Sequence, residues 1–248
     1  MEWRVIKLRP IGAYMNMGID EAVMESVRDG RADPTIRFYT WNPSAVSIGR
    51  FQSMREEVNI GRCKELGVDC VRRITGGGAV YHDRNGEVTY SVIAPERLLP
   101  KGIRESYREI CGWVISGLAS IGIRAEFAPI NDITVNGKKI SGNAQTRKDG
   151  IVLQHGTILY DLDIKAMFGV LNVSREKISD KAIKSVEERV TRVLDYSSVS
   201  QNGLYLALLS GFVRNKEYKM GELTADEASR SEELAGSVYR SDQWNFSR

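Results

Sequence analysis

Cysteine is scarce in this 248-residue chain, which contains only Cys63, Cys70 and Cys111. An odd number of thiols without a CxxC spacing argues against a disulfide framework and against a structural zinc site. No stretch of about 18 apolar residues occurs, so the sequence predicts no transmembrane helix. The first ten residues, MEWRVIKLRP, carry charges where a signal peptide needs an apolar core. These absences predict a cytoplasmic protein with no membrane partner.

Long runs of one charge are also missing. The sequence has no run of five or six basic residues, and its net charge is only +3, so we expect no nucleic-acid partner. Hydrophobic residues make up 42% of the chain, which is enough for one substantial core. Because no linker rich in proline or glycine divides the chain, we predict one domain over residues 1–248.

The order of local patterns predicts strands first and helices later. Residues 16–29 place Ile19, Val23 and Val27 four apart, which predicts an amphipathic helix with Asn16 as its cap. A second helix is predicted over residues 104–121, and the chain has a mainly helical pattern from about residue 163. Strands are predicted over residues 35–40, 45–49, 68–74, 88–94 and 151–160. This order predicts an α+β fold with a largely antiparallel central sheet flanked by helices.

Two short signals predict local structure in more detail. Asn136 and Gly137 separate two alternating runs, and this pair suits a type I′ hairpin turn because both turn positions need a positive φ. Thr224 with Glu227 three residues later forms a capping-box pattern, which predicts the start of a helix.

The segment RRITGGGAVYHD, residues 72–83, contains three adjacent glycines. Glycine costs more conformational entropy on folding than other residues, so three together need a reason. Backbone N–H groups in such a loop can approach a phosphate or carboxylate closely, and Arg73 adds a planar positive group. A tight turn or bulge is the alternative. No GK[ST] follows and no GxGxxG is present, so neither a Walker A loop nor a dinucleotide fingerprint is supported.

Two further segments contain chemically useful side chains. NDITVNGKKISGNAQ, residues 131–145, combines Asp132 and Lys139 with small residues that let a ligand approach the backbone. A carboxylate such as Asp132 can hold Mg²⁺ together with substrate phosphates, or it can pair with a lysine. LQHGTIL, residues 153–159, carries His155 in an apolar strand. Neither His155 nor His82 has a neighbouring serine or cysteine in the sequence that would predict a triad.

These three segments, in this order, resemble the lipoate–protein ligase A family within the biotin/lipoate ligase superfamily. The resemblance runs from FYTWNPSAVSIGRFQ near residue 38 to about residue 195, and the tail YRSDQWN is similar to single-domain members. It implies a fold shared with biotin ligases and related to class II aminoacyl-tRNA synthetases. It also implies that an accessory C-terminal domain is absent from this chain, so a separate accessory subunit is a possible partner.

The resemblance implies an ATP-dependent lipoate–protein ligase. Such an enzyme uses ATP and Mg²⁺ to convert its substrate lipoate to lipoyl-AMP. It then transfers the lipoyl group to a lysine of an acceptor lipoyl domain, either in an E2 subunit of a 2-oxoacid dehydrogenase or in the glycine cleavage H protein. Preorganised backbone N–H groups and a lysine would stabilise the charge on phosphate and carboxylate oxygens.

The resemblance also implies roles for individual residues. Lys139 would be the catalytic residue and hold the carboxylate and phosphate oxygens. Asp132 would bind the metal, and His155 and His82 would line the lipoate pocket. The residues implied in binding ATP and lipoyl-AMP, together with Lys139, are Arg73, Gly76, Gly77, Gly78, Ala79, Val80 and Tyr81.

Three alternatives stay open at this stage. Octanoyl- and lipoyl-transferases of the same superfamily act from an acyl carrier through a cysteine thioester, but RAEFAPIND, residues 124–132, contains no cysteine. Cys70, on the strand that enters the glycine loop, is then the only remaining candidate for the thioester-forming cysteine. Biotin ligase is disfavoured because RRITGGG stands where GRGRxGR would be expected. A non-catalytic protein that binds a lipoyl domain is the third alternative.

Overall fold

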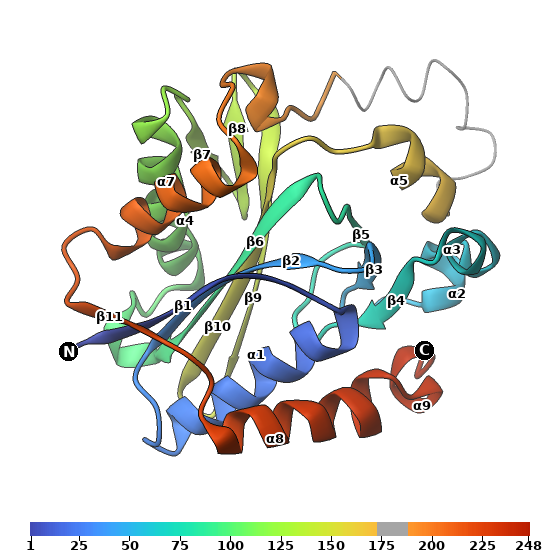
Figure 1. Ribbon diagram of the computed structural model, residues 1–248, viewed down its shortest axis with the longest axis horizontal. Helices are drawn as coiled ribbons and strands as arrows, with labels where there is room; N and C mark the ends of the chain where they lie inside the picture. Colours follow the sequence, from blue (N-terminus) through green and yellow to red (C-terminus); the bar gives the residue numbers. More distant parts are fainter. Residues whose placement is uncertain (173–187) are drawn as a thin grey trace.

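The computed structural model describes residues 1–172 and 188–248, and its centre is an eight-stranded sheet (Figure 1). The strands lie in the order β11-β1-β2-β6-β10-β9-β8-β7. Only the pairs β1–β11 and β1–β2 are parallel; the other neighbours in this sheet are antiparallel. The strands of this sheet are β1 (Trp3–Ile11), β2 (Thr35–Trp41), β6 (Glu87–Pro95), β7 (Glu126–Ala128), β8 (Asp132–Val135), β9 (Lys138–Lys148), β10 (Ile151–Leu159) and β11 (Tyr218–Gly221).

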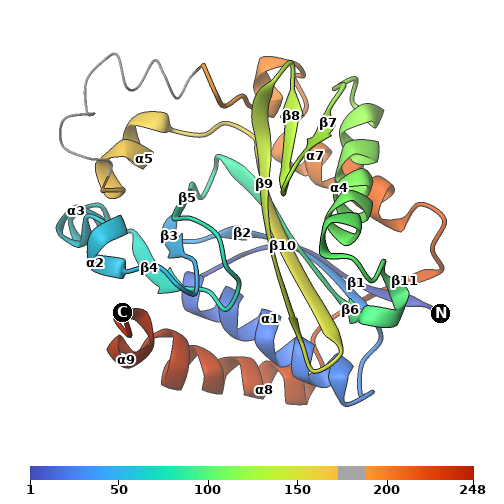
Figure 2. The same ribbon diagram turned by 180° about the vertical axis from the view of Figure 1, so that it is seen from behind.

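Helices cover both faces of this sheet, and a small second sheet lies beside one end of it (Figure 2). The second sheet has the order β4-β3-β5, formed by β3 (Ala45–Ile48), β4 (Asp69–Arg72) and β5 (Val80–His82). The helices are α1 (Ala13–Arg28), α2 (Met54–Glu57), α3 (Ile60–Leu66), α4 (Ile103–Ser120), α5 (Ile164–Val170), α7 (Gln201–Val213), α8 (Ala225–Leu234) and α9 (Asp242–Asn245). Short helical turns are η1 (Glu96–Leu98), η3 (Val193–Asp195) and the π-helical η4 (Ala235–Tyr239).

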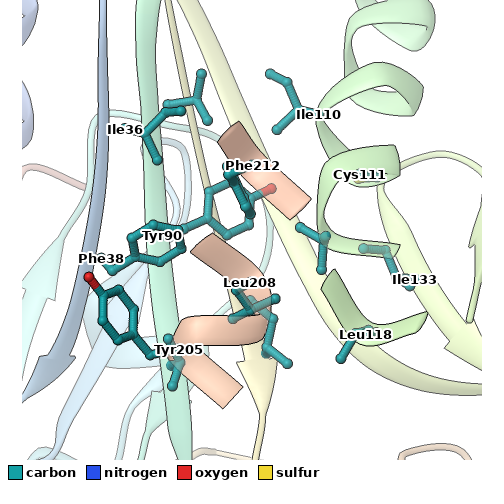
Figure 3. Close-up of a cluster of buried hydrophobic side chains, with 14 of the residues drawn as sticks. Ile36, Phe38, Tyr90, Ile110, Cys111, Leu118, Ile133, Tyr205, Leu208 and Phe212 are labelled. Atoms are coloured by element: carbon teal, nitrogen blue, oxygen red, sulfur yellow. The ribbon is translucent and has the colours of Figure 1, made fainter. Parts of the chain in front are cut away.

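One face of the large sheet packs against α4 and α7 (Figure 3). Tyr90 of β6 and Phe38 of β2 meet Phe212 of α7 there, with ring centroids 4.8 and 5.2 Å apart. Ile110 and Leu118 of α4 complete the same cluster. Because successive residues of a strand point to opposite faces, the strand residues next to Phe38 and Tyr90 belong to the other face of the sheet.

The opposite face packs against α1 and carries polar as well as apolar side chains. Ile93 of β6 and Leu153 of β10 pack there against Val23 of α1. On the same strands, Ser91 and His155 are buried and polar. The helix α8 lies alongside α1 (Figure 2). This face therefore holds the polar groups from which a site can be built.

The α+β class with a largely antiparallel sheet flanked by helices is confirmed. The hairpin turn also forms as predicted, with φ of 51° at Asn136 and 76° at Gly137. The capping box at Thr224 and Glu227 is present with both reciprocal hydrogen bonds. No helix in the described ranges is both long enough and apolar enough to cross a membrane.

Other expectations need correction. The helix predicted over residues 16–29 begins at Ala13, and Gly12 rather than Asn16 is its N-cap. Asn16 is instead buried, and its side chain donates to the carbonyl of Ile11 and accepts from Arg37. In the region predicted to be mainly helical, the described residues also include the strand β11, while residues 173–187 lie outside the described residues.

Candidate active site

A cavity of about 300 Å³ lies between the large sheet, the small sheet and the segment around α5. Its buried end is formed by Met17, Trp41 and Thr89, which are almost inaccessible to water. Its more exposed end includes Gly77, Gly78 and Lys139. Most of the wall is apolar, and the apolar side chains include Val80, Leu159, Leu162, Met167, Leu171 and Val190.

The three glycines follow β4 at the edge of this cavity, and each has a different environment. Gly77 has a φ of +96°, which L-residues rarely adopt. A Cβ at Gly77 would also approach Nη2 of Arg73 to 2.9 Å, so a glycine is required there by the backbone. A Cβ at Gly76 or Gly78 would enter open space. Of these two, Gly78 lines the cavity and is the position where a ligand can lie against the backbone.

Arg73 holds the glycine loop in place through hydrogen bonds to the backbone of the loop. Its Nη2 donates to the carbonyls of Gly76 and Gly78, both at 2.8 Å. Its Nη1 donates to the carbonyl and Oγ of Ser47, and its Nε donates to Thr75. Burial lowers the pKa of Arg73 to about 10. The chain's own oxygens therefore engage the whole guanidinium, and an arriving anion would compete with them.

Lys139 lies at the exposed end of the cavity, where its Nζ is 2.7 Å from Oδ1 of Asp132. The lysine side chain is 41% exposed, so it can exchange this partner for a ligand. Gly142, three residues further along β9, makes room for it. A Cβ at Gly142 would lie 2.8 Å from both Cε and Nζ of Lys139. Glycine at this position therefore lets the lysine lie back over its own strand.

At the buried end of the cavity, the imidazole of His82 lies within hydrogen-bonding distance of both a serine hydroxyl and a carboxylate. Its Nε2 is 2.8 Å from Oγ of Ser47, and its Nδ1 is 2.7 Å from Oε1 of Glu87. The imidazole stacks on Trp41, with centroids 3.9 Å apart. The second oxygen of Glu87 is buried and has no hydrogen-bond partner in the described part of the chain. Ser47 is only 1% exposed, which separates this hydroxyl from bulk water.

His155, on β10, likewise lies within hydrogen-bonding distance of both a hydroxyl and a carboxylate. Its Nε2 is 2.7 Å from Oγ1 of Thr75, and its Nδ1 is 3.3 Å from Oδ2 of Asp20. Asp20 also accepts from Arg37 at 2.8 Å and from Ser91 at 2.8 Å.

Burial affects the titration of both members of this pair. Burial lowers the pKa of His155, although the hydrogen bond and charge of Asp20 oppose that effect. For Asp20, burial alone would raise the pKa, but the His155 hydrogen bond and the Arg37 charge hold it below its usual value. The ionised form of the carboxyl group is therefore favoured inside the fold.

None of the three cysteines lines the cavity. Cys63 and Cys111 are buried in hydrophobic clusters, and Cys70 is partly buried on β4. Burial raises the pKa of Cys111 to about 12, and the hydrogen bond with Cys63 together with burial raises the pKa of Cys70. Thiols with a raised pKa, such as those of Cys70 and Cys111, are poor nucleophiles, because the thiolate is the reactive form. The hydrogen bond with Cys70 lowers the pKa of Cys63, but that thiol is 1% exposed and lies outside the cavity wall.

The structure brings most of the expected site residues to one cavity. The expected site residues that line this cavity are Arg73, Gly77, Gly78, Ala79, Val80, Tyr81, His82, Lys139 and His155. Gly76 and Asp132 do not line it, but each contacts a residue that does. Within residues 1–172 and 188–248, no group of three or more His, Cys, Asp or Glu side chains is placed to hold a metal ion.

Sequence reasoning missed several wall residues. Met17 and Trp41 come from α1 and β2, Ser47 comes from β3, and Leu162 and Val190 come from loops. Their residue types are those of an ordinary core, so they gave no chemical signal. Only the alternation of side chains along β2 could have shown that Trp41 and Phe38 lie on opposite faces of the sheet, so that Trp41 can line the cavity while Phe38 belongs to the core.

The chain belongs to the family of the lipoyl protein ligase A/B catalytic domain, whose model matches residues 12–212. The octanoyltransferase LipM of Kyrpidia tusciae is 37% identical, with 98% of each chain covered. A bi-partite lipoate protein ligase from Thermoplasma acidophilum, studied with its E2 lipoyl domain, is 34% identical. It has a TM-score of 0.89 and covers 99% of this chain and 96% of that one. A lipoate-protein ligase A bound with ATP is 31% identical, has a TM-score of 0.85 and covers 99% of each chain.

The expectation of an ATP-dependent lipoate ligase is wrong by this comparison. Curated relatives over nearly the whole length are named octanoyltransferase, which favours the transferase alternative. There is a physical reason why the motifs could not separate the two reactions. Backbone N–H groups and a lysine can stabilise negative charge on an acyl carbonyl oxygen in the transfer step of either reaction, whichever leaving group the acyl carbon carries. The coarser prediction, an enzyme of the lipoate and octanoate attachment family, stands.

Proposed function

We propose that this chain transfers an octanoyl group from an acyl-carrier thioester to a lysine of a lipoyl domain. The observation that carries the proposal is the apolar cavity with Lys139 and the glycine loop at its open end. The octanoyltransferases that resemble the chain over its full length support the choice of acyl group. The acceptor is a lipoyl domain of an E2 subunit or of the glycine cleavage H protein.

The acyl chain occupies the apolar part of the cavity. Each buried methylene contributes about 0.8 kcal/mol, so the tail of an octanoyl group contributes roughly 5 kcal/mol when it is fully enclosed. The wall around it contains Leu159, Leu162 and Met167. This contribution anchors the substrate while its carbonyl stays at the more exposed end, within reach of an acceptor lysine.

Lys139 acts on the carbonyl oxygen. As the acceptor amine attacks, negative charge develops on that oxygen, and a positioned ammonium stabilises it. Lys139 leaves Asp132 and approaches the oxygen, while the backbone at Gly78 lies against the substrate. In this assignment Arg73 and the two histidines hold the loop and the cavity wall.

In this proposal the transfer is direct, because no cysteine lines the cavity and the hydroxyl of Ser47, the other candidate nucleophile, is only 1% exposed. The neutral ε-amine of the acceptor lysine forms a C–N bond with the carbonyl carbon, and the C–S bond of the donor breaks. The proton lost by the amine ends on the departing thiolate, so neither charge nor protons accumulate. Donor and acceptor must then be bound at the same time, which predicts sequential kinetics.

The first test mixes the purified chain with an octanoyl-carrier thioester and an unmodified lipoyl domain, without ATP. We expect the lipoyl domain to gain one octanoyl group, measured by intact mass. A parallel reaction contains free lipoate or octanoate with ATP and Mg²⁺. Modification only in that second reaction would overturn the transferase proposal. A third arm with an added accessory subunit checks whether the chain needs a partner.

The same mass measurement tests the direct route. We expect no octanoyl adduct on the enzyme when the donor is supplied alone. An adduct would replace direct transfer by a covalent route without removing the proposed function. Ser47 would be the first residue to search, because its hydroxyl is hydrogen-bonded to His82.

A further inference from the structure

A second cavity, of about 680 Å³, lies next to the first. It is formed by residues 161–165, 190–192, 195 and 196 together with Lys138. The two cavities share two wall residues, Leu162 and Val190. They are therefore neighbouring compartments, and these two apolar side chains form the boundary.

The paired lysines of β9 are divided between the compartments. Lys139 lines the first cavity and Lys138 lines the second, as expected when successive strand residues point to opposite sides. The backbone next to Lys139 fixes the boundary, because its N–H donates to Arg189 and its carbonyl accepts from Thr191, both at 2.8 Å. Val190 is thereby held beside Lys139.

The second cavity has a different chemical character from the first. Arg192 pairs with Asp161 at 3.0 Å and with Asp195 at 3.1 Å. The Thr191 hydroxyl lies 2.8 Å from Asp195 and 3.1 Å from the hydroxyl of Tyr196. Besides the apolar Leu162, Ile164 and Val190, this wall presents hydroxyl groups and equal numbers of acidic and basic side chains around one aromatic ring. Such a mixed wall suits a flexible polar chain better than an acyl tail.

We propose that the second cavity binds the pantetheine-type arm of the acyl donor, an inference that rests on the proposed octanoyl transfer. A thioester of this kind has an apolar acyl chain on one side of its carbonyl. On the other side it has a polar arm with two amides and a phosphate. The two cavities differ in the same way, since the first is mainly apolar and the second is more polar. Lys139 lies at their boundary, beside Val190. The arm's amides bind near Thr191 and Tyr196. Lys165 and Lys138 provide positive charge for the phosphate, on a wall where Arg192 pairs with Asp161 and Asp195 and where Asp163 is a further carboxylate.

The arm can be tested with donors of increasing length. Octanoyl-N-acetylcysteamine carries only the start of the arm, whereas octanoyl-pantetheine carries both amides without phosphate. We expect kcat/KM to be about tenfold higher for octanoyl-pantetheine. Tyr196→Ala should remove most of that preference and leave the rate with octanoyl-N-acetylcysteamine unchanged. Tyr218→Ala is the matched control, since the two tyrosines are 39% and 44% exposed and Tyr218 lies on β11.

The phosphate is tested separately. Octanoyl-coenzyme A and the octanoyl-carrier protein share the phosphorylated arm, so Lys165→Glu should raise KM for both about tenfold and leave octanoyl-pantetheine unaffected. Lys64→Glu, a charge reversal on the exposed surface of α3, is the control. An effect on the carrier protein alone would mean that Lys165 contacts its protein surface, and it would overturn the phosphate assignment.

The outcomes separate this inference from the proposed function. Transfer from all donors with equal kcat/KM, unchanged in Tyr196→Ala, would remove the arm site while octanoyl transfer stands. Absence of transfer from every thioester in the wild-type chain would remove the proposed function itself. A uniform loss with all donors in Tyr196→Ala would mean that Tyr196 only supports the fold, and it would also overturn the arm site.

Discussion

The two faces of the large sheet are built from alternate residues of the same strands, yet their contents differ. On β6, Tyr90 and Val92 face α4 and α7 in an apolar cluster. Between them, Ser91 faces α1, where it donates to Asp20. Among the described residues, the cluster on the first face consists of hydrophobic side chains alone. The second contains a buried carboxylate, a histidine and part of the cavity wall.

The difference indicates that stability and chemistry are divided between the two faces. The α4/α7 face stabilises the fold by burying apolar area, at roughly 25 cal/mol per Å². On the α1 face, burying Asp20 and Arg37 has a large desolvation cost that the pair has to offset. Polar groups on that face are kept in place by partners such as His155. Substitutions on the two faces should therefore change different measured quantities.

The largest expected effect is on stability, at the apolar face. Phe212→Ala should lower the free energy of unfolding by about 3–5 kcal/mol, because it removes a fully buried ring from between Phe38 and Tyr90. Denaturant unfolding measures the loss. Leu206→Ala, an exposed position on the same helix, is the control and should change stability by less than about 0.5 kcal/mol. Transfer activity per folded molecule should stay near wild type, and a specific loss of activity would contradict the division between faces.

The next effect is on activity, at the open end of the cavity. Lys139→Ala should lower the rate of octanoyl transfer by about two to three orders of magnitude, the usual loss when one oxyanion donor is removed. Its free energy of unfolding should change little, because the side chain is partly exposed. Gly142→Ala should also lower the rate, since the new Cβ would displace the ammonium of Lys139.

Lys148→Ala, an exposed lysine on the same strand, is the control for both variants. Near-normal transfer in Lys139→Ala would remove this lysine from the catalytic assignment. A Gly142→Ala enzyme that unfolds more easily but transfers normally would mean that the glycine serves packing alone.

A smaller effect is expected on the pH dependence of stability. Burial lowers the pKa of His155 in the folded chain below its ordinary value of 6.5, so the unfolded chain binds more protons just below that pH. Stability should therefore fall as the pH drops below about 6.5, by at most about 1.4 kcal/mol per pH unit for one group. The depressed pKa of Asp20 adds a further loss only below about pH 3.8.

Thermal unfolding of the wild type and His155→Gln between pH 7.5 and 5 measures the histidine contribution. The variant should be less stable at pH 7.5 but should show a flatter dependence on pH. Parallel curves for the two proteins would assign the pH dependence to other groups.

The smallest expected effect is at Ser141, which does not line the cavity and whose strand partners Ile133 and Ile158 belong to the apolar cluster. The Ser141 hydroxyl is buried and has no hydrogen-bond partner within the described residues. Ser141→Ala should therefore leave stability unchanged within about 0.5 kcal/mol or raise it slightly, because no hydrogen bond is lost. Transfer activity should also be retained. A loss of more than about 1 kcal/mol in thermal or denaturant unfolding would show that this hydroxyl has a partner after all.

The sequence by itself determined the local conformations and the family. Turn and cap preferences depend on the backbone of a few adjacent residues, so the Asn136–Gly137 turn and the Thr224 cap were predictable. The glycine and lysine segments were also recognisable, because their residue types are unusual for a core. The identity of the acyl donor was not, since both reactions need the same stabilised oxygen.

Only the tertiary structure decided which side chains meet. His155 lies 135 residues from Asp20, and Arg72 reaches Asn245 across 173 residues. Arg73 was expected to contact nucleotide and phosphate groups, but its guanidinium is engaged by Ser47, Thr75 and the loop carbonyls. Such partners depend on how separate strands and helices pack, and local propensity contains no information about that. The cavity, its apolar wall and its second compartment therefore appear only when the whole chain is folded.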